Sequence, residues 1–144
     1  AITADGMQIS SVQRADTEPE FHEYATESEY IQKLIQTARA SKELKGTTAF
    51  VALNTETATH TAQLLGDDSP TLIGEGDTLP NSGSILLSLP LAKGLEFDHV
   101  VIVDANKNDF PENDLSRRRL YTAISRATST VSIFSNGELS PLLK

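Results

Sequence analysis

The sequence contains no cysteine, which excludes disulfides, thiolate metal sites and cysteine nucleophiles. It also lacks any stretch near the roughly 20 apolar residues that cross a bilayer, and its first residues lack the basic start and apolar run of a signal peptide. These absences suit a protein of the reducing cytosol, and we expect a cytoplasmic location. The 144 residues, with 38% apolar side chains, fit one globular domain spanning 1–144.

Basic side chains are scarce, because 12 Lys and Arg stand against 20 Asp and Glu and give a net charge of −8. The acidity lies in residues 1–83, which carry 5 basic and 13 acidic side chains, whereas residues 84–144 carry 7 of each. A freestanding nucleic-acid binder usually has a basic patch and a high pI, and the pI here is about 4.8. Most of the attraction for any nucleic acid must therefore come from elsewhere. We interpret the acidic part as a solvated face, with a docking surface as the alternative.

The P-loop is absent, since no Gly-x-x-x-x-Gly-Lys-[Ser/Thr] occurs in the chain. Residues 100–104 imitate a Walker B strand, with four apolar residues followed by Asp104. Without a P-loop, Asp104 is interpreted as a strand-end loop residue or a capping residue. The three histidines have no metal-ligand spacing, so no metal site is predicted: His22, His60 and His99.

Alternating strand and helix patterns predict an α/β fold. Helices are expected from about Thr26, where Glu29 completes a capping-box spacing, from Asn54 to Gly66, and over 113–127. An acidic connector is expected over 16–20, and strands over 7–12, 47–53, 71–73, 84–89, 99–103 and 130–134. The central strands are continuously apolar, which favours a parallel sheet covered by helices on both faces. The prediction is a three-layer α/β domain.

One loop combines residue types that suit nucleotide chemistry. A strand ends near Leu89, where Pro90 stops it, and the loop that follows carries Lys93, Gly94 and Glu96. Ligands gather at strand ends in open α/β sheets, so the loop is suitably placed. Glycine allows close backbone approach, lysine can meet a phosphate, and glutamate can accept hydrogen bonds from sugar hydroxyls or water. By itself such a turn is more often a solvated loop.

The expected helix over 113–127 places Leu120, Ile124 and Ala127 on one face that should pack on the sheet. Arg126 lies near its C-terminal end, where a cation is locally favoured by the helix dipole. The functional interpretation is an arginine finger, whose planar guanidinium neutralises charge on a transferring phosphoryl group.

The two segments together resemble motifs V and VI of UvrD-like superfamily 1 helicases. Residues 92–98 read Ala-Lys-Gly-Leu-Glu-Phe-Asp, and residues 120–127 read Leu-Tyr-Thr-Ala-Ile-Ser-Arg-Ala. Between them, Phe110 and Pro111 resemble a pair often found in that family's connecting loop. The resemblance covers about residues 85–134, and upstream only the strand–helix order is compatible.

The resemblance implies a RecA-like C-terminal motor domain of an ATP-dependent DNA helicase or translocase. ATP with Mg²⁺ would be bound mainly by an N-terminal RecA-like domain of the same parent chain, which carries the Walker motifs. Arg126 would be the catalytic arginine finger, Gly94 and Glu96 would bind nucleotide beside it, and Lys93 would couple the nucleotide to single-stranded DNA. The chain alone is expected to be inactive.

Two departures from the family pattern keep a second function open. Pro90 stands where members commonly have histidine, and this resembles the helicase IV or HelD branch, some members of which act on RNA polymerase. The alternative is therefore a RecA-like protein-interaction module that remodels RNA polymerase. Arg119 replaces a usually apolar residue and predicts a more exposed helix. The chain begins at Ala1, without an initiator methionine or a clear motif IV arginine, and we expect a piece of a longer protein.

Overall fold

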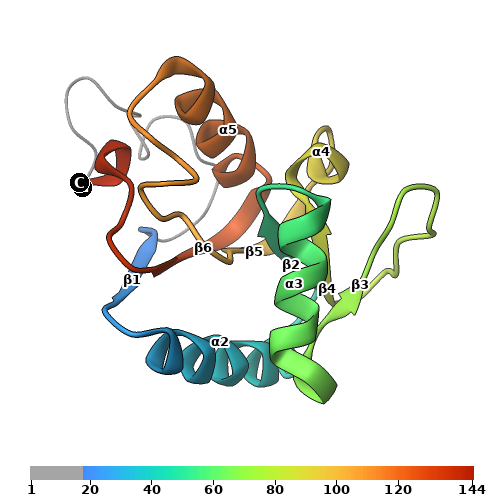
Figure 1. The fold of residues 1–144 in the computed structure, drawn as a ribbon. Coiled ribbons are helices and arrows are strands. Elements are labelled where there is room, and N and C mark those ends of the chain that lie inside the picture. The colour runs from blue at the N-terminus through green and yellow to red at the C-terminus, as the bar shows by residue number, and fades with distance from the viewer. Residues whose placement is uncertain (1–17) are drawn as a thin grey trace.

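The computed structural model describes residues 18–144 (Figure 1). The expected strand over 7–12 and the start of the acidic connector lie outside the described residues. The elements follow one another as β1 (Glu20–Tyr24), α2 (Glu27–Ser41), β2 (Thr47–Ala52), α3 (Thr55–Leu65), β3 (Thr71–Leu72), β4 (Gly83–Ser88), α4 (Leu89–Ala92), β5 (Phe97–Ile102), α5 (Asp114–Ile124) and β6 (Ala127–Asn136). Short 3-10 turns cover Gly66–Asp68 and Pro141–Leu143.

The strands form one six-stranded sheet in the order β1-β6-β5-β2-β4-β3, and every neighbouring pair is parallel. Figure 1 shows α2 along one side of the sheet and α5 on the other. The predicted three-layer α/β fold with a parallel sheet is confirmed. No helix within residues 18–144 is long and apolar enough to cross a membrane.

Strand β2 explains why both faces of the sheet need covering, because successive side chains point to opposite faces. Ala49 and Val51 pack in one buried cluster with Leu120 of α5. Phe50, between them, packs in a second cluster with Leu34 of α2. The continuous apolar run of this strand is thus two alternating sets of core residues.

The predicted starts of two helices are confirmed by their caps. Thr26 Oγ1 accepts a hydrogen bond from the Glu29 N–H at 3.3 Å, at the start of α2. Asn54 Oδ1 accepts one from the Thr57 N–H at 2.8 Å, at the start of α3. Each side chain pairs an N–H that the first helical turn leaves without a partner.

The edge strand β1 is absent from the sequence prediction, which includes only its first residue, Glu20, in the connector over 16–20. Its two glutamates are exposed and its other three residues are only partly buried, so the strand has no apolar run. The strand is nevertheless held on β6, and the His22 ring stacks on Phe134 at 4.6 Å between centroids. Edge strands with one paired side carry a weak hydrophobic signal, which explains the omission.

The predicted C-terminal end of α5 was wrong by three residues. The helix ends at Ile124, Ser125 caps it, and Ala127 is the first residue of β6. The Arg126 carbonyl accepts a hydrogen bond from the Phe97 N–H at 2.8 Å, so sheet pairing competes with the helix here. Ala127 is buried as predicted, but in the sheet and not on the helix.

Candidate functional site

Arg126 lies in the turn between α5 and β6, and three hydrogen bonds hold its half-buried guanidinium. Nε donates to the Thr122 carbonyl at 3.1 Å, and Nη2 donates to Ser125 Oγ at 3.1 Å. Nη1 donates to the Leu95 carbonyl at 3.2 Å, which lies in the loop over 93–96. The structure therefore joins the two segments that the sequence singled out separately.

The site lies at the amino edge of the sheet. Glu96 immediately precedes β5 and Arg126 immediately precedes β6, and these neighbouring strands are parallel. The loop that carries Lys93, Gly94 and Glu96 is predicted to lie where a strand ends. For its last residue this prediction was wrong, because Glu96 lies at the start of β5. The connection after β4 must cross the face of the sheet to reach the start of β5. It therefore runs from one edge to the other, and Glu96 is at its far end.

Helix α4 begins that crossing and was not predicted. Pro90 stands in its first turn, where a residue without an N–H is tolerated, so it starts a short helix instead of ending a strand in a loop. Lys93 is the exposed C-cap residue. Gly94 follows with a φ of +84°, a left-handed conformation that favours glycine, and a Cβ there would have no neighbour within 4 Å.

A pocket of about 580 Å³ lies between α4 and α5, and we call it the α4–α5 pocket. Its basic lining residues are Lys93, Arg118 and Arg119, and it has no acidic lining residue. Within residues 18–144 none of the three is in an ion pair. Lys93 thus lines a pocket that contains neither Glu96 nor Arg126, which divides the predicted site residues into two groups.

Sequence reasoning missed Arg118 and Tyr121 as lining residues of this pocket. The feature that could have indicated the pocket is the run of three arginines within α5, residues 117–119. Arg117 pairs with Asp114, and the other two line the pocket. Arg119 had been predicted to make the helix locally more exposed, and its side chain is half-buried. Periodicity alone does not show which member of such a run faces a neighbouring element.

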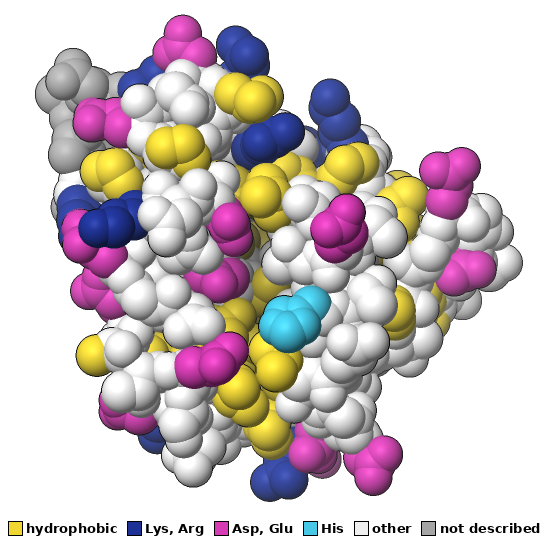
Figure 2. All heavy atoms as spheres, viewed as in Figure 1, with side chains coloured by type: hydrophobic (Ala, Val, Ile, Leu, Met, Phe, Trp, Pro, Cys, Tyr) yellow, Lys and Arg dark blue, Asp and Glu magenta, His cyan; other side chains and the backbone are white. Residues whose placement is uncertain are grey.

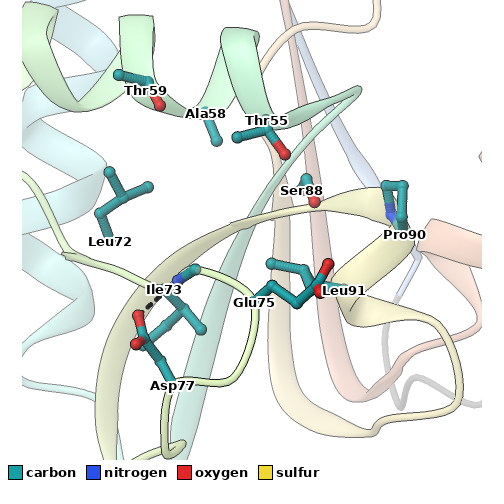
Figure 3. Close-up of a pocket in the computed structure, with 11 residues that line it drawn as sticks. Thr55, Ala58, Thr59, Leu72, Ile73, Glu75, Asp77, Ser88, Pro90 and Leu91 are labelled. Atoms are coloured by element: carbon teal, nitrogen blue, oxygen red, sulfur yellow. Dashed lines mark hydrogen bonds between the residues drawn. The ribbon is translucent and has the colours of Figure 1, made fainter.

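A second pocket of about 570 Å³ lies beside α3, β3 and the loop after β3, and we call it the α3–β3 pocket. Figure 3 shows Thr55, Ser88 and Leu91 around it. Its charged lining residues are Glu75 and Asp77, and the Asp77 carboxylate accepts a hydrogen bond from the Gly74 N–H at 2.7 Å. The two pockets therefore differ in the sign of their charge.

Asp104 takes no part in either pocket. Its Oδ1 accepts a hydrogen bond from the Asn136 N–H at 2.9 Å, which ties the end of β5 to the end of β6. Burial raises the pKa of the Asp104 carboxyl, against the opposing effect of hydrogen bonds from Asn136 and Asn106. The predicted place of this residue in a loop at a strand end is confirmed. Among residues 18–144 no group of three or more His, Asp or Glu side chains could hold a metal ion.

Comparison with known families places these contacts in context. Residues 84–134 match the family described as UvrD-like helicase C-terminal domain. The predicted resemblance is confirmed. This UvrD-like segment, as we call residues 84–134, includes Lys93, Gly94, Glu96 and Arg126.

Among solved structures, the chain is similar to the C-terminal domain of a possible DNA helicase from Lactobacillus plantarum WCFS1. The TM-score is 0.77 at 23% identity, over 95% of this chain and 89% of that chain. At this level of identity the likeness shows a shared fold, which extends well beyond the UvrD-like segment. A search of curated proteins found no match to the chain.

Proposed function

We propose that this chain is the C-terminal motor domain of an ATP-dependent superfamily 1 DNA helicase or translocase. The observation that carries the proposal is the hydrogen bond from Arg126 Nη1 to the Leu95 carbonyl, at 3.2 Å. It joins the two stretches of the UvrD-like segment at the amino edge of the sheet. Arg126, Gly94 and Glu96 then form one half of a nucleotide site.

Arg126 has donors left for a phosphate. Guanidinium carries five N–H donors, and three hydrogen bonds within the chain are present. In this proposal the remaining donors stabilise charge on the γ-phosphate during transfer. The exposed Glu96 carboxylate would accept hydrogen bonds from the ribose, and the Gly94 backbone would allow close approach of the nucleotide.

The other half of the site belongs to a second RecA-like domain. The chain has no P-loop, so we propose that a P-loop domain of the same parent protein binds ATP and most of its Mg²⁺. This chain alone should therefore bind ATP weakly and hydrolyse none.

The test is ATP turnover in the parent protein that carries this chain and a P-loop domain. Arg126→Ala should lower turnover by roughly 10³–10⁵-fold, the usual contribution of an arginine finger. Arg126→Lys keeps the charge but loses the planar fork, and should restore only part of the rate. Unchanged turnover in a folded Arg126→Ala variant would contradict the assignment.

Arg39→Ala is the matched control for that experiment. Arg39 is an exposed arginine of α2, on the other face of the sheet, and its Nε pairs with Asp68 Oδ1 at 2.9 Å. Its loss should leave turnover unchanged. Melting temperatures of all three variants separate a catalytic effect from loss of the Arg126 hydrogen bonds that support the turn.

Docking on RNA polymerase is the second candidate function. It is favoured by the acidic α3–β3 pocket, with Glu75 and Asp77, and by Pro90 in place of the family's usual histidine. Turnover that single-stranded DNA stimulates would support the nucleic-acid motor. Turnover that depends on Arg126 but is indifferent to DNA, together with a tight complex with purified polymerase, would support the alternative.

A further inference from the structure

The α3–β3 pocket combines an apolar lining with negative charge. Glu75 and Asp77, in the loop after β3, are its charged lining residues, and none of its described lining residues is Lys or Arg. Figure 2 shows acidic side chains but no basic ones on that loop, and hydrophobic side chains between the loop and α3. The pocket therefore suits a ligand that is both apolar and cationic. Its apolar lining residues are Ala58, Leu72, Ile73, Pro90 and Leu91.

Both carboxylates of the pocket are available to a ligand. Glu75 and Asp77 are exposed, and within residues 18–144 neither is in an ion pair. Asp77 accepts one hydrogen bond, from the Gly74 N–H at 2.7 Å. An ionised carboxylate has about four acceptor sites, so most of its capacity remains. Figure 3 shows the Glu75 side chain extending across the pocket toward Leu91, which places negative charge beside the apolar lining.

Ser88 provides a second, independent observation that points to a ligand. The residue is the last of β4, lines the pocket and is only 2% exposed. Within residues 18–144 its hydroxyl takes part in no hydrogen bond. Figure 3 shows this hydroxyl directed into the space between Thr55 and Glu75. Because buried polar groups are nearly always hydrogen-bonded, we expect a ligand atom inside the pocket to pair with it.

The pocket continues to an open edge of the sheet. Strand β3 is the last strand in the sheet order, and within the described part of the chain only β4 pairs with it. Leu72 of this strand is 40% exposed and lines the pocket. An edge strand offers unpaired backbone groups to an extended segment of another chain. A protein segment can therefore occupy the pocket and the edge together, which a small cation cannot do.

The neighbouring α4–α5 pocket has the opposite charge. Pro90 lines both pockets, so they are adjacent. The α4–α5 pocket has three basic lining residues and no acidic one, the reverse of the α3–β3 pocket. A cation is attracted by the α3–β3 pocket and repelled by its neighbour, whereas an anion experiences the reverse. The charge of the α3–β3 pocket thus selects a cationic segment and disfavours a ligand that carries phosphates.

We propose that the α3–β3 pocket binds an extended, arginine-bearing segment of a partner protein. The guanidinium pairs with the Glu75 and Asp77 carboxylates, because its planar fork matches a carboxylate. The methylene stem of the arginine and a neighbouring apolar side chain lie against Leu72 and Leu91. An N–H of the segment donates to the Ser88 hydroxyl. This inference goes beyond the proposed motor function and identifies the partner by its chemistry alone.

Titration of the full 144-residue chain with a model peptide, followed by amide NMR shifts, tests the proposal. The peptide is Gly-Leu-Arg-Leu-Arg-Gly, acetylated and amidated at its ends so that only the arginines are charged. The shifts should gather at residues 55–59, 71–77 and 88–91, which include the lining of the pocket. Affinity should fall as salt rises, because exposed charge pairs are screened. Shifts elsewhere, or none at millimolar peptide, would overturn the proposal.

Charge-neutral variants test the two carboxylates. Glu75→Gln with Asp77→Asn should weaken peptide binding roughly tenfold, the combined loss of two exposed charge pairs. Asparagine keeps an acceptor for the Gly74 N–H, so the loop should stay folded. Glu43→Gln with Glu112→Gln is the matched control, because it removes two exposed charges that line neither pocket. Equal affinities in the two double variants would overturn the proposal.

Ser88→Ala tests the unpartnered hydroxyl. It should weaken peptide binding roughly fivefold, the loss of one hydrogen bond. Its melting temperature should stay unchanged, because within residues 18–144 the hydroxyl has no partner to lose. Lower stability with unchanged peptide affinity would overturn the assignment of Ser88 to the ligand.

Three further ligands separate a cationic protein segment from other occupants. The same peptide with citrulline in place of arginine keeps its shape but not its charge, and should bind at least about tenfold more weakly. Free arginine that binds as tightly as the peptide would overturn the assignment to a protein segment. An octamer of thymidylate that shifts the same resonances and displaces the peptide would overturn it in favour of nucleic acid. None of these experiments involves ATP, so a negative result leaves the Arg126 turnover test intact.

Discussion

Helices α2 and α3 cover one face of the sheet, and α4 and α5 cover the other. The buried clusters on the two faces are both apolar, and Leu34 of α2 and Leu120 of α5 are both fully buried. The outer surfaces differ. Arg39 of α2 is paired with Asp68, whereas Arg118 and Arg119 of α5 line a pocket without carboxylates.

The difference shows that the buried side chains of a helix determine how it packs, whereas its exposed side chains determine what it can bind. Both helix layers are needed to bury the central strands, so stability alone cannot tell which layer carries a site. The charge left without a partner within residues 18–144 distinguishes them, together with the contacts to Arg126. The variants below compare what the two faces and the edges of the sheet contribute to stability.

Leu34→Ala and Leu120→Ala are expected to have the largest effects on stability. Both side chains are fully buried, so each substitution should lower the free energy of unfolding by about 2–5 kcal/mol. Urea unfolding measures this. A loss confined to one of the two variants would break the likeness between the buried layers of the two faces.

Gly46→Ala tests the amino edge of the sheet, just before β2. Gly46 has a φ of +82°, and a Cβ there would lie 2.0 Å from Asp98 Oδ2. That carboxylate accepts a hydrogen bond from the Thr47 N–H at 2.9 Å, so the clash would also disturb the start of β2. The expected loss is roughly 1–3 kcal/mol, measured by urea unfolding.

Gly94→Ala is the matched control, because its φ of +84° is nearly the same but its Cβ would meet nothing within 4 Å. Its cost should come from the backbone alone and be smaller. A Gly94→Ala variant that loses as much stability as Gly46→Ala would show that the loop over 93–96 is under a constraint from elsewhere in the chain.

The sequence predicted the sheet and its helices well wherever apolar residues are continuous or capped. The strands over 47–53 and 84–89 and the starts at Thr26 and Asn54 were found within a residue of their observed positions. Strand β1 was missed because edge burial is weak, and the end of α5 was misplaced because Ala127 suits a helix face and a buried strand equally. These errors arise where local pattern and tertiary pairing compete.

The candidate site was predictable as a set of residues but not as an arrangement. The motif resemblance named Lys93, Gly94, Glu96 and Arg126 together. It could not show that Lys93 lines a pocket to which neither Glu96 nor Arg126 belongs, because that depends on how α4 carries the chain across the sheet. Arg118 and its neighbours became candidates only when the helix was seen beside α4.

Thr26→Ala and Asn54→Ala each remove the N-terminal cap of a helix, the first that of α2 and the second that of α3. Each side chain accepts a hydrogen bond from an N–H in the first turn of its helix, so each variant should lose about 1 kcal/mol of stability. Of the two, only Asn54 lines the α4–α5 pocket. Urea unfolding measures both losses, and a loss in only one variant would show that the two caps are not equivalent.

Asp104→Asn should have the smallest effect, seen only in the pH dependence of stability. The pKa of Asp104 is raised above 3.8 by burial, so the folded protein binds this proton more tightly than the unfolded chain. Stability from this group is present below pH 4 and is lost as pH rises through the folded pKa. The variant has no such proton, and its unfolding free energy should fall less than that of the original chain as pH rises from 4 to 7. Urea unfolding across this range measures the difference.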